Sequence, residues 1–214
     1  ARRGLVQRGR GRPRGQESMI TLLFVGDGER DAAMLPPIVR TIVGSEFSTI
    51  SEHWSRLWQG GGGYHRKLIY ASKQALDRGA KGVVAVVDVD RDRKGVRLAK
   101  LKSAQSEIHQ KSPALRVAVG EAVPHGEAWL LDDPGAVRTA LELSAEAPIK
   151  RGNNPKEELE SLTAQSPNPV SSFKESCARI AEKVQTDRCQ HAKETGFADF
   201  VDDVKAHLCP LFAA

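Results

Sequence analysis

The 214-residue chain has few cysteines, no long apolar run and no apolar segment behind its basic N-terminus. Its three cysteines, Cys177, Cys189 and Cys209, are an odd number, lie far apart and form no zinc-binding pattern. No apolar stretch is long enough to cross a membrane, and the N-terminus lacks the apolar core of a secretory signal. We therefore expect a reduced, cytoplasmic protein without a membrane partner.

The glycine run at residues 60–63 also lacks something, because no Lys-Ser or Lys-Thr pair follows it as in a Walker phosphate loop. We interpret it as a mobile loop that lets the backbone approach a ligand closely. No internal repeat is present. Hydrophobic residues make up 40% and charged residues 28% of the chain, which is typical of a globular protein.

Composition divides the chain into an arm and one domain. Residues 1–18 are rich in Arg and Gly, which predicts a disordered arm. Its origin stays open: either it is foreign to the native protein, with Met19 as the natural start, or it is a true basic arm that binds phosphates. We expect an α/β core in residues 19–147, and in residues 148–214 a loop and C-terminal helices of the same domain that pack on the sheet.

Charge is uneven along the chain. The arm holds six arginines and one glutamate, which equals the whole net charge of +5. Residues 56–116 hold 14 Lys or Arg against 5 Asp or Glu, whereas residues 117–214 hold 10 against 16. A basic segment suits a polyanionic substrate such as nucleic acid. Solvated helix faces are the alternative interpretation of these cations.

The apolar run at residues 83–87 ends in the pair Asp88 and Asp90. Its small and β-branched residues predict a strand buried on both faces of a parallel sheet, and ligands bind at the carboxyl edge of such sheets. The two carboxylates point the same way on a continuing strand and repel each other unless a cation lies between them. This pattern favours a divalent metal site, for Mg²⁺ or Mn²⁺. A charged turn is the alternative.

A second apolar run, at residues 20–25, ends in the loop from Gly26 to Asp31 and then a helix. Asp27 follows its strand as Asp88 ends the other, so the carboxylates converge if the two strands are neighbours. A turn or N-cap role is the alternative for Asp27. Within the helix, Pro36 and Pro37 predict a kink or a restart.

The remaining pattern alternates strands and helices, which predicts an α/β fold with a mainly parallel central sheet flanked by helices on both faces. The further strands are expected at residues 47–50 and 115–119, and the further helices at residues 64–76, 94–110, 134–143, 155–162, 171–184 and 197–208. Glu127 is expected on a loop that leads into a short packed helix. The adjacent His125 is a candidate base or metal ligand, although a lone loop histidine is more often neither.

The order of a strand, an Asp-Gly-x-x-Asp loop, a helix and a later strand ending in Asp-x-Asp resembles the Toprim domain of topoisomerases, bacterial primases and overcoming-lysogenization-defect (OLD) type nucleases. Gly28, Asp31, Asp88 and Asp90 match its motifs. Asp27 stands where the family has a glutamate. This shorter side chain either moves the general acid/base or leaves its role to Glu29.

Residues 127–134, residues 154–157 and the glycine run resemble a Toprim-like family of unknown function. Its members are bacterial, and many are encoded beside an ABC-type ATPase in phage-defence loci. The resemblance implies an Mg²⁺-dependent nuclease subunit that works with such an ATPase on nucleic acid, with DNA rather than RNA as the expected substrate. Self-association into a homo-oligomer is compatible with it.

The resemblance also implies roles for single residues. Asp88 and Asp90 would hold the metal, Asp27 would be a second ligand or the general acid/base helped by Glu29, and Glu127 would add a ligand. The candidates for holding phosphates are Arg30, Arg66, Lys67, Arg91 and Arg93. Two other functions stay open: a non-catalytic Toprim-like adaptor or regulator of the ATPase, and a metal-dependent nucleotide-sugar enzyme that uses Asp-x-Asp.

Overall fold

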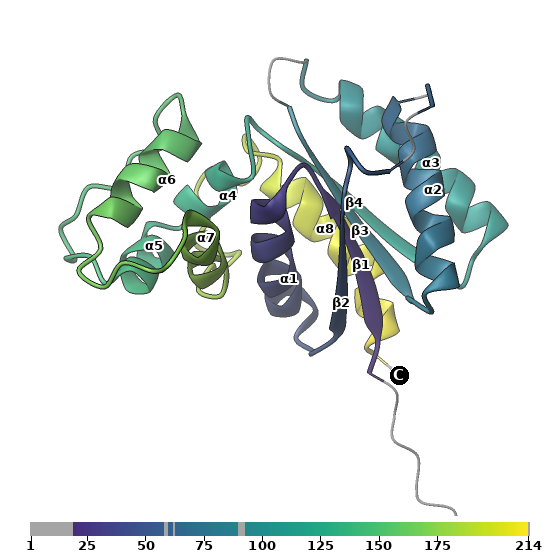
Figure 1. Cartoon of the computed structure of the whole chain (residues 1–214), viewed down its shortest axis with the longest axis horizontal. Helices are drawn as coiled ribbons and strands as arrows, with labels where there is room; N and C mark the ends of the chain where they lie inside the picture. The colour runs from purple at the N-terminus through teal and green to yellow at the C-terminus, as the bar shows by residue number, and fades with distance from the viewer. Residues whose placement is uncertain (1–18, 58–59, 62, 90–92, 214) are drawn as a thin grey trace, which may run out of the picture.

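A computed structural model describes residues 19–57, 60–61, 63–89 and 93–213. Within these ranges four strands form one all-parallel sheet in the order β2-β1-β3-β4. The carboxyl ends of the strands lie at the top of the view in Figure 1. The strands are β1 (Thr21–Gly26), β2 (Ser48–His53), β3 (Gly82–Asp88) and β4 (Arg116–Ala122).

Helices connect the strands and continue beyond β4, which confirms the predicted α/β class. In the described part of the chain they are α1 (Glu29–Val43), α2 (Gly63–Asp77), α3 (Val96–Lys111), α4 (Glu127–Leu131), α5 (Pro134–Leu141), α6 (Pro155–Ala164), α7 (Phe173–Ala181), α8 (Phe197–His207) and the short 3₁₀ helix η1 (Cys209–Leu211). The predictions for the arm at residues 1–18, and for Gly62, Asp90 and Arg91, lie outside the described residues.

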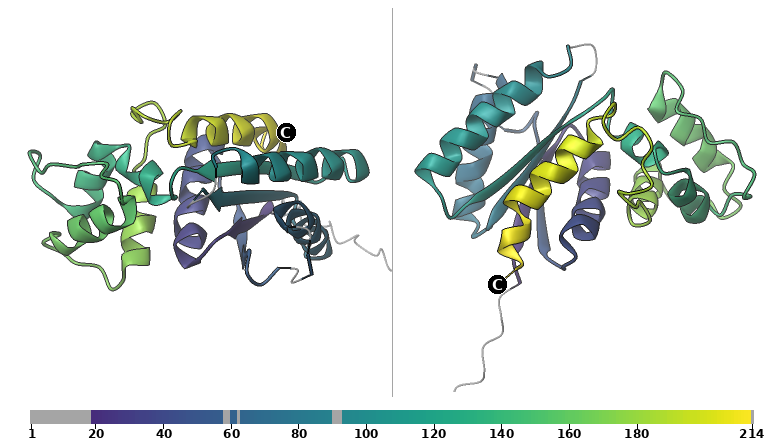
Figure 2. Two further views of the ribbon diagram at one scale, coloured as in Figure 1. Left: turned by 90° about the horizontal axis from the view of Figure 1, so that it is seen from above. Right: turned by 180° about the vertical axis from the view of Figure 1, so that it is seen from behind.

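Along β1, β3 and β4 both faces of the sheet are buried, with successive side chains pointing to opposite sides. On β1, Leu22 and Phe24 belong to the core that α1 and α8 cover, whereas Leu23 and Val25 belong to the core that α2 and α3 cover. Figure 2 shows α8 running along the sheet on the side away from α2. The predicted three-layer arrangement is therefore present.

The outer edge of β4 is closed by side chains from two helices. Asp203 of α8 accepts a hydrogen bond from the backbone N–H of Val119 at 2.7 Å, and Gln105 of α3 donates to the carbonyl of Val117 at 2.7 Å. Gln105 also donates to Asp203 at 2.8 Å. An edge strand normally leaves such groups open to pairing with another chain, so these contacts protect this side of the sheet.

A single helix α1 runs from Glu29 to Val43 with Pro36 and Pro37 inside it, so the restart that was one of the two expected effects of the prolines does not occur. Proline removes a hydrogen-bond donor from a helix interior. Here the buried residues Met34 and Ile38 hold the helix against the sheet on both sides of the prolines. Tertiary packing offsets the local penalty.

Helices α4 to α7 gather beside α1 rather than over the sheet (Figure 1), and α7 contacts α1. Helices α5 and α6 begin with side-chain caps: Asp133 and Asn154 accept from the N–H groups of Ala136 and Glu157. Of the expected C-terminal helices, α8 packs directly on β4. Among the described helices, none combines the length and the apolar character that crossing a membrane demands.

Candidate active site at the carboxyl edge of the sheet

Asp27 and Asp88 meet because β1 and β3 are neighbours in the sheet. Asp27 follows the last residue of β1, and Asp88 is the last residue of β3. The Oδ2 atom of Asp27 accepts a hydrogen bond from the backbone N–H of Asp88 at 3.1 Å. The condition set by the sequence for convergence, that these strands are adjacent, is fulfilled.

The carboxylate of Asp88 is held by the loop that follows β4. Its Oδ1 atom accepts from the backbone N–H of Gly126 at 3.1 Å, and its Oδ2 atom lies 3.5 Å from Nδ1 of His125. The side chain is 14% exposed. The Asp88 side chain is therefore mostly buried at the sheet edge. His125 lies beside it, at the candidate site.

Asp31 adds a third carboxylate from the first turn of α1. Its Oδ2 atom accepts from the backbone N–H groups of Asp27 and Gly28, at 2.6 and 3.2 Å. The pKa of Asp31 is raised to about 6, chiefly by burial; the charges of Asp27 and Glu127 add to the rise, and the two backbone hydrogen bonds oppose it. Sequence reasoning treated Asp31 only as part of a motif, although it orders the Asp27 loop.

Glycine is required where the Asp27 loop turns. A Cβ at Gly26 would lie 2.4 Å from Cβ of Asp31, a distance that real side chains do not tolerate. A Cβ at Gly126 would lie 3.1 Å from Cε of Met34 and 3.4 Å from Oδ1 of Asp31. The backbones at both glycines thus approach the Asp31 side chain closely, and this brings the two loops together.

Glu127 and Arg30 lie close together and pair with each other, which leaves neither turned towards Asp27 and Asp88 as a free charge. Glu127 begins α4, its side chain is 4% exposed, and it forms an ion pair with Arg30 of α1. The Arg30 guanidinium also lies 6.0 Å from the centre of the Phe173 ring. The predicted metal ligand and the predicted phosphate-binding cation therefore neutralise one another. The carboxylate of Glu29 lies 3.6 Å from the Lys174 ammonium of α7.

The basic candidates lie on the α2 side of the edge. Lys67 donates to the carbonyl of Trp54 at 2.8 Å, and Arg66 donates to the carbonyl of Gly61 at 3.3 Å. Arg93 lies just before α3 and is exposed. Both helical cations thus donate to backbone carbonyls between β2 and α2, while Arg93 is the described candidate nearest in sequence to the Asp-x-Asp.

Arg97 is a site residue that sequence reasoning missed. It donates to the backbone carbonyl of Asp88 at 2.6 Å, and its guanidinium lies 5.5 Å from the centre of the Tyr64 ring. Its position in the first turn of the helix after an acidic strand end was the available signal. Only the crossing of α3 over β3 shows that it reaches back to Asp88.

The donor set fits a hard cation such as Mg²⁺, which needs only one or two carboxylates in addition to water and substrate oxygens. Asp27 and Asp88 supply two carboxylates at one edge. Among the residues outside the undescribed gaps, no three His, Cys, Asp or Glu side chains converge closely enough to hold a metal ion. Asp90, the other half of the predicted pair, lies in the 90–92 gap.

Comparison with family models, curated proteins and solved structures finds no match for this chain.

Proposed function

We propose that the chain is an Mg²⁺-dependent, Toprim-type nuclease subunit that cleaves phosphodiester bonds of nucleic acid, with DNA as the expected substrate. The observation that carries the proposal is the hydrogen bond from the Asp88 backbone to Asp27, which joins the two acidic strand ends at the carboxyl edge. The parallel sheet with helices on both faces is the fold that the resemblance to Toprim proteins implies.

Within this proposal each residue has a limited task. Asp27, Asp88 and Asp90 would hold the cation, which when bound neutralises the phosphate and activates water. His125, 3.5 Å from Asp88, is placed to hold or move a proton at the edge. Arg97 fixes the backbone of Asp88 and so keeps its carboxylate in position. Arg66, Lys67, Arg91 and Arg93 remain the candidates for binding the phosphate backbone.

The test is cleavage of supercoiled plasmid in Mg²⁺ or Mn²⁺ by the full chain, alone and with the ABC-type ATPase that the resemblance implies. Asp88→Asn keeps an acceptor for the Gly126 N–H but removes the charge. We expect it to reduce cleavage by more than the roughly 10- to 100-fold that outer-shell changes cost at metal sites. Asp77→Asn, at the exposed end of α2, is the matched control and should cleave normally.

Metal binding is measured separately by titrating Mn²⁺ calorimetrically into the chain and into both variants. The proposal expects binding that Asp88→Asn abolishes and Asp77→Asn preserves. Intact plasmid in every arm, together with the absence of Mn²⁺ binding, would refute it.

One observation favours a second candidate, a non-catalytic adaptor or regulator of the ATPase. The ion pair between Arg30 and Glu127 leaves both charges committed within the protein, as in a structural rather than a catalytic cluster. The adaptor hypothesis expects the chain to change the ATPase rate without cleaving DNA. It also expects the Asp88→Asn variant to change the ATPase rate as much as the wild-type chain does. A rate effect that Asp88→Asn removes would argue against the adaptor.

A further inference from the structure

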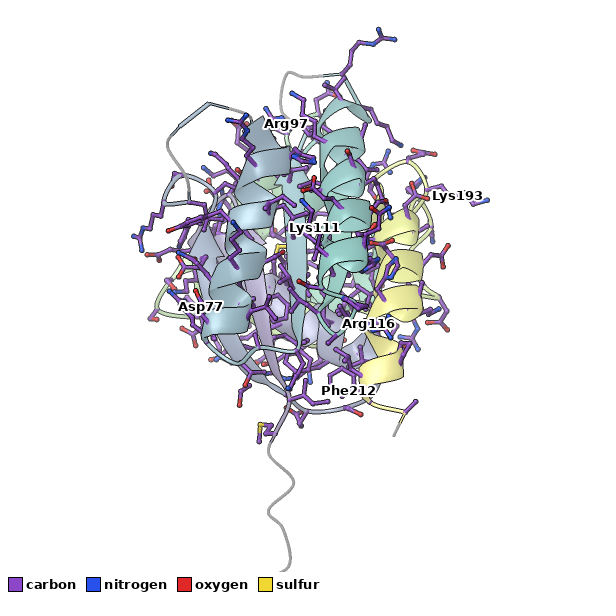
Figure 3. All side chains as sticks on the ribbon, turned by 90° about the vertical axis from the view of Figure 1, so that its right-hand side faces the viewer. Asp77, Arg97, Lys111, Arg116, Lys193 and Phe212 are labelled. Carbon is purple, nitrogen blue, oxygen red and sulfur yellow. The ribbon has the colours of Figure 1, made fainter. Side chains whose placement is uncertain are left out.

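The outer surface between α2 and α3 contains a groove on the face of the molecule that Figure 3 views directly. A hollow of about 300 Å³ lies near His65, Tyr70 and Glu107, and a smaller one of about 70 Å³ lies near Leu76 and Leu115. Ile69 and Lys73 line both hollows, so they form one continuous groove along the two helices. We call it the α2–α3 groove.

The floor of the α2–α3 groove is apolar. Ile69 and Leu76 are seven residues apart on α2 and therefore lie on one face of that helix, and Leu115 closes the groove from the other side. Leu76 is 46% exposed and Tyr70 38%. Among the described residues only four large hydrophobic side chains are this exposed, and these two are among them. These two side chains offer apolar area beside the hollows that a partner could bury.

The rim of the groove is positively charged. Arg66, Lys73 and Lys111 line it, and its one carboxylate, Glu107, is already engaged. Glu107 accepts from Lys111 at 2.6 Å and lies 3.2 Å from His65, and the Lys111 hydrogen bond lowers the pKa of Glu107. A partner therefore meets an apolar floor between cationic borders.

We propose that the α2–α3 groove binds an acidic amphipathic helix of a partner protein. An apolar stripe at i, i+3, i+4 and i+7 fits the floor, and flanking Glu or Asp side chains fit the cationic rim. The exposed Leu76 and Tyr70 favour this occupant over nucleic acid, whose backbone offers charge but no apolar stripe. The inference goes beyond the proposed nuclease activity and does not depend on it.

Neither the sequence of residues 1–18 nor the described helices of this chain offer an exposed acidic amphipathic helix that could occupy the groove. The arm at residues 1–18 is basic. Helix α6 carries Glu157, Glu158 and Glu160, but its apolar residues Leu159 and Leu162 are buried. Of the exposed large hydrophobics in the described residues, none lies on a helix rich in acidic residues. A different protein, rather than a second copy, is therefore the partner.

The probe is a fluorescent helical peptide of roughly 18 residues with leucines at i, i+3, i+4 and i+7 and glutamates on both flanks. Its binding to the full chain is followed by anisotropy in EDTA, so that metal-dependent activity plays no part. A scrambled peptide of the same composition and a version with Lys in place of Glu are the controls. We expect saturable binding of the first peptide only.

Lys73→Glu and Leu76→Glu change exposed positions of the groove and should each weaken binding at least tenfold, with unchanged circular dichroism. Lys205→Glu, exposed on α8, is the control of equal charge change and should bind like the wild type. In the wild type, amide NMR shifts caused by the peptide should map to α2 and α3. No binding, equal binding of the scrambled peptide, or binding of a short DNA duplex that Lys73→Glu abolishes without any peptide binding would overturn the proposal.

Discussion

Gly126 is the residue at which the two loops of the candidate site join. Its N–H donates to Asp88. A Cβ at this position would lie so close to the side chains of Met34 and Asp31 that these would have to shift. Gly26 makes the same kind of close approach from the other loop. Two residues without side chains thus decide how near the carboxylates come.

Gly26→Ala should separate Asp31 from the Asp27 loop, because the added Cβ would lie 2.4 Å from Cβ of Asp31. We expect a loss of roughly 1–3 kcal/mol in the free energy of unfolding, measured by urea denaturation. Gly28→Ala, where an added Cβ meets nothing within 4 Å, is the control and should cost less than about 1 kcal/mol as an N-cap change. Equal losses for the two variants would contradict this steric account.

At the scale of elements, the outer edge of β4 depends on side chains from α3 and α8. Asp203 is 7% exposed and accepts from the Val119 N–H, from Gln105 and from Lys102. One carboxylate therefore satisfies a strand and a helix together. Burial of this group is compatible with its charge because these donors surround it.

Asp203→Ala should leave the Val119 N–H without its acceptor and remove one of the two hydrogen bonds that Gln105 donates. We expect the free energy of unfolding to fall by about 2–4 kcal/mol. Asp202→Ala changes the exposed neighbour on the same helix and should stay within about 0.5 kcal/mol of the wild type. Chemical denaturation of both variants measures the difference; coinciding midpoints would show that the β4 edge does not need Asp203.

At the scale of the whole molecule, the layers meet in a seam between α3 and α8 that contains two histidines. The rings of His109 and His207 lie 4.8 Å apart between centroids. Burial lowers the pKa of His109 below its ordinary value of 6.5; the charges of His207, Arg116 and Lys102 lower it further, and Asp203 opposes them. The folded protein therefore favours neutral His109.

His109 should consequently destabilise the folded protein as the pH falls below about 6.5, because the unfolded chain then binds a proton that folded His109 resists. Above that pH, His109 is neutral in both the folded and the unfolded state, and this loss of stability disappears. Melting temperatures between pH 7.5 and 5 should fall less steeply in His109→Phe than in the wild type. His53→Gln, on β2 at the opposite edge of the sheet, should follow the wild-type slope; equal slopes for His109→Phe and the wild type would exclude His109 as the cause.

The sequence by itself determined the local features of this protein. The apolar run before Asp88 predicted a doubly buried strand, and the predicted helices at residues 134–143 and 155–162 begin where α5 and α6 begin, because strand burial and helix starts depend on neighbouring residues. It also placed Asp27 and Asp88 at strand ends, where ligands of α/β folds bind.

Only the tertiary structure decided which of these ends meet. In the strand order, β1 lies between β2 and β3, and its contact with β3 joins Asp27 to Asp88. It also pairs Arg30 with Glu127 and carries α1 through its prolines. These contacts join residues distant in sequence or depend on burial against other elements, and no local pattern encodes either, because packing energy rather than propensity selects them.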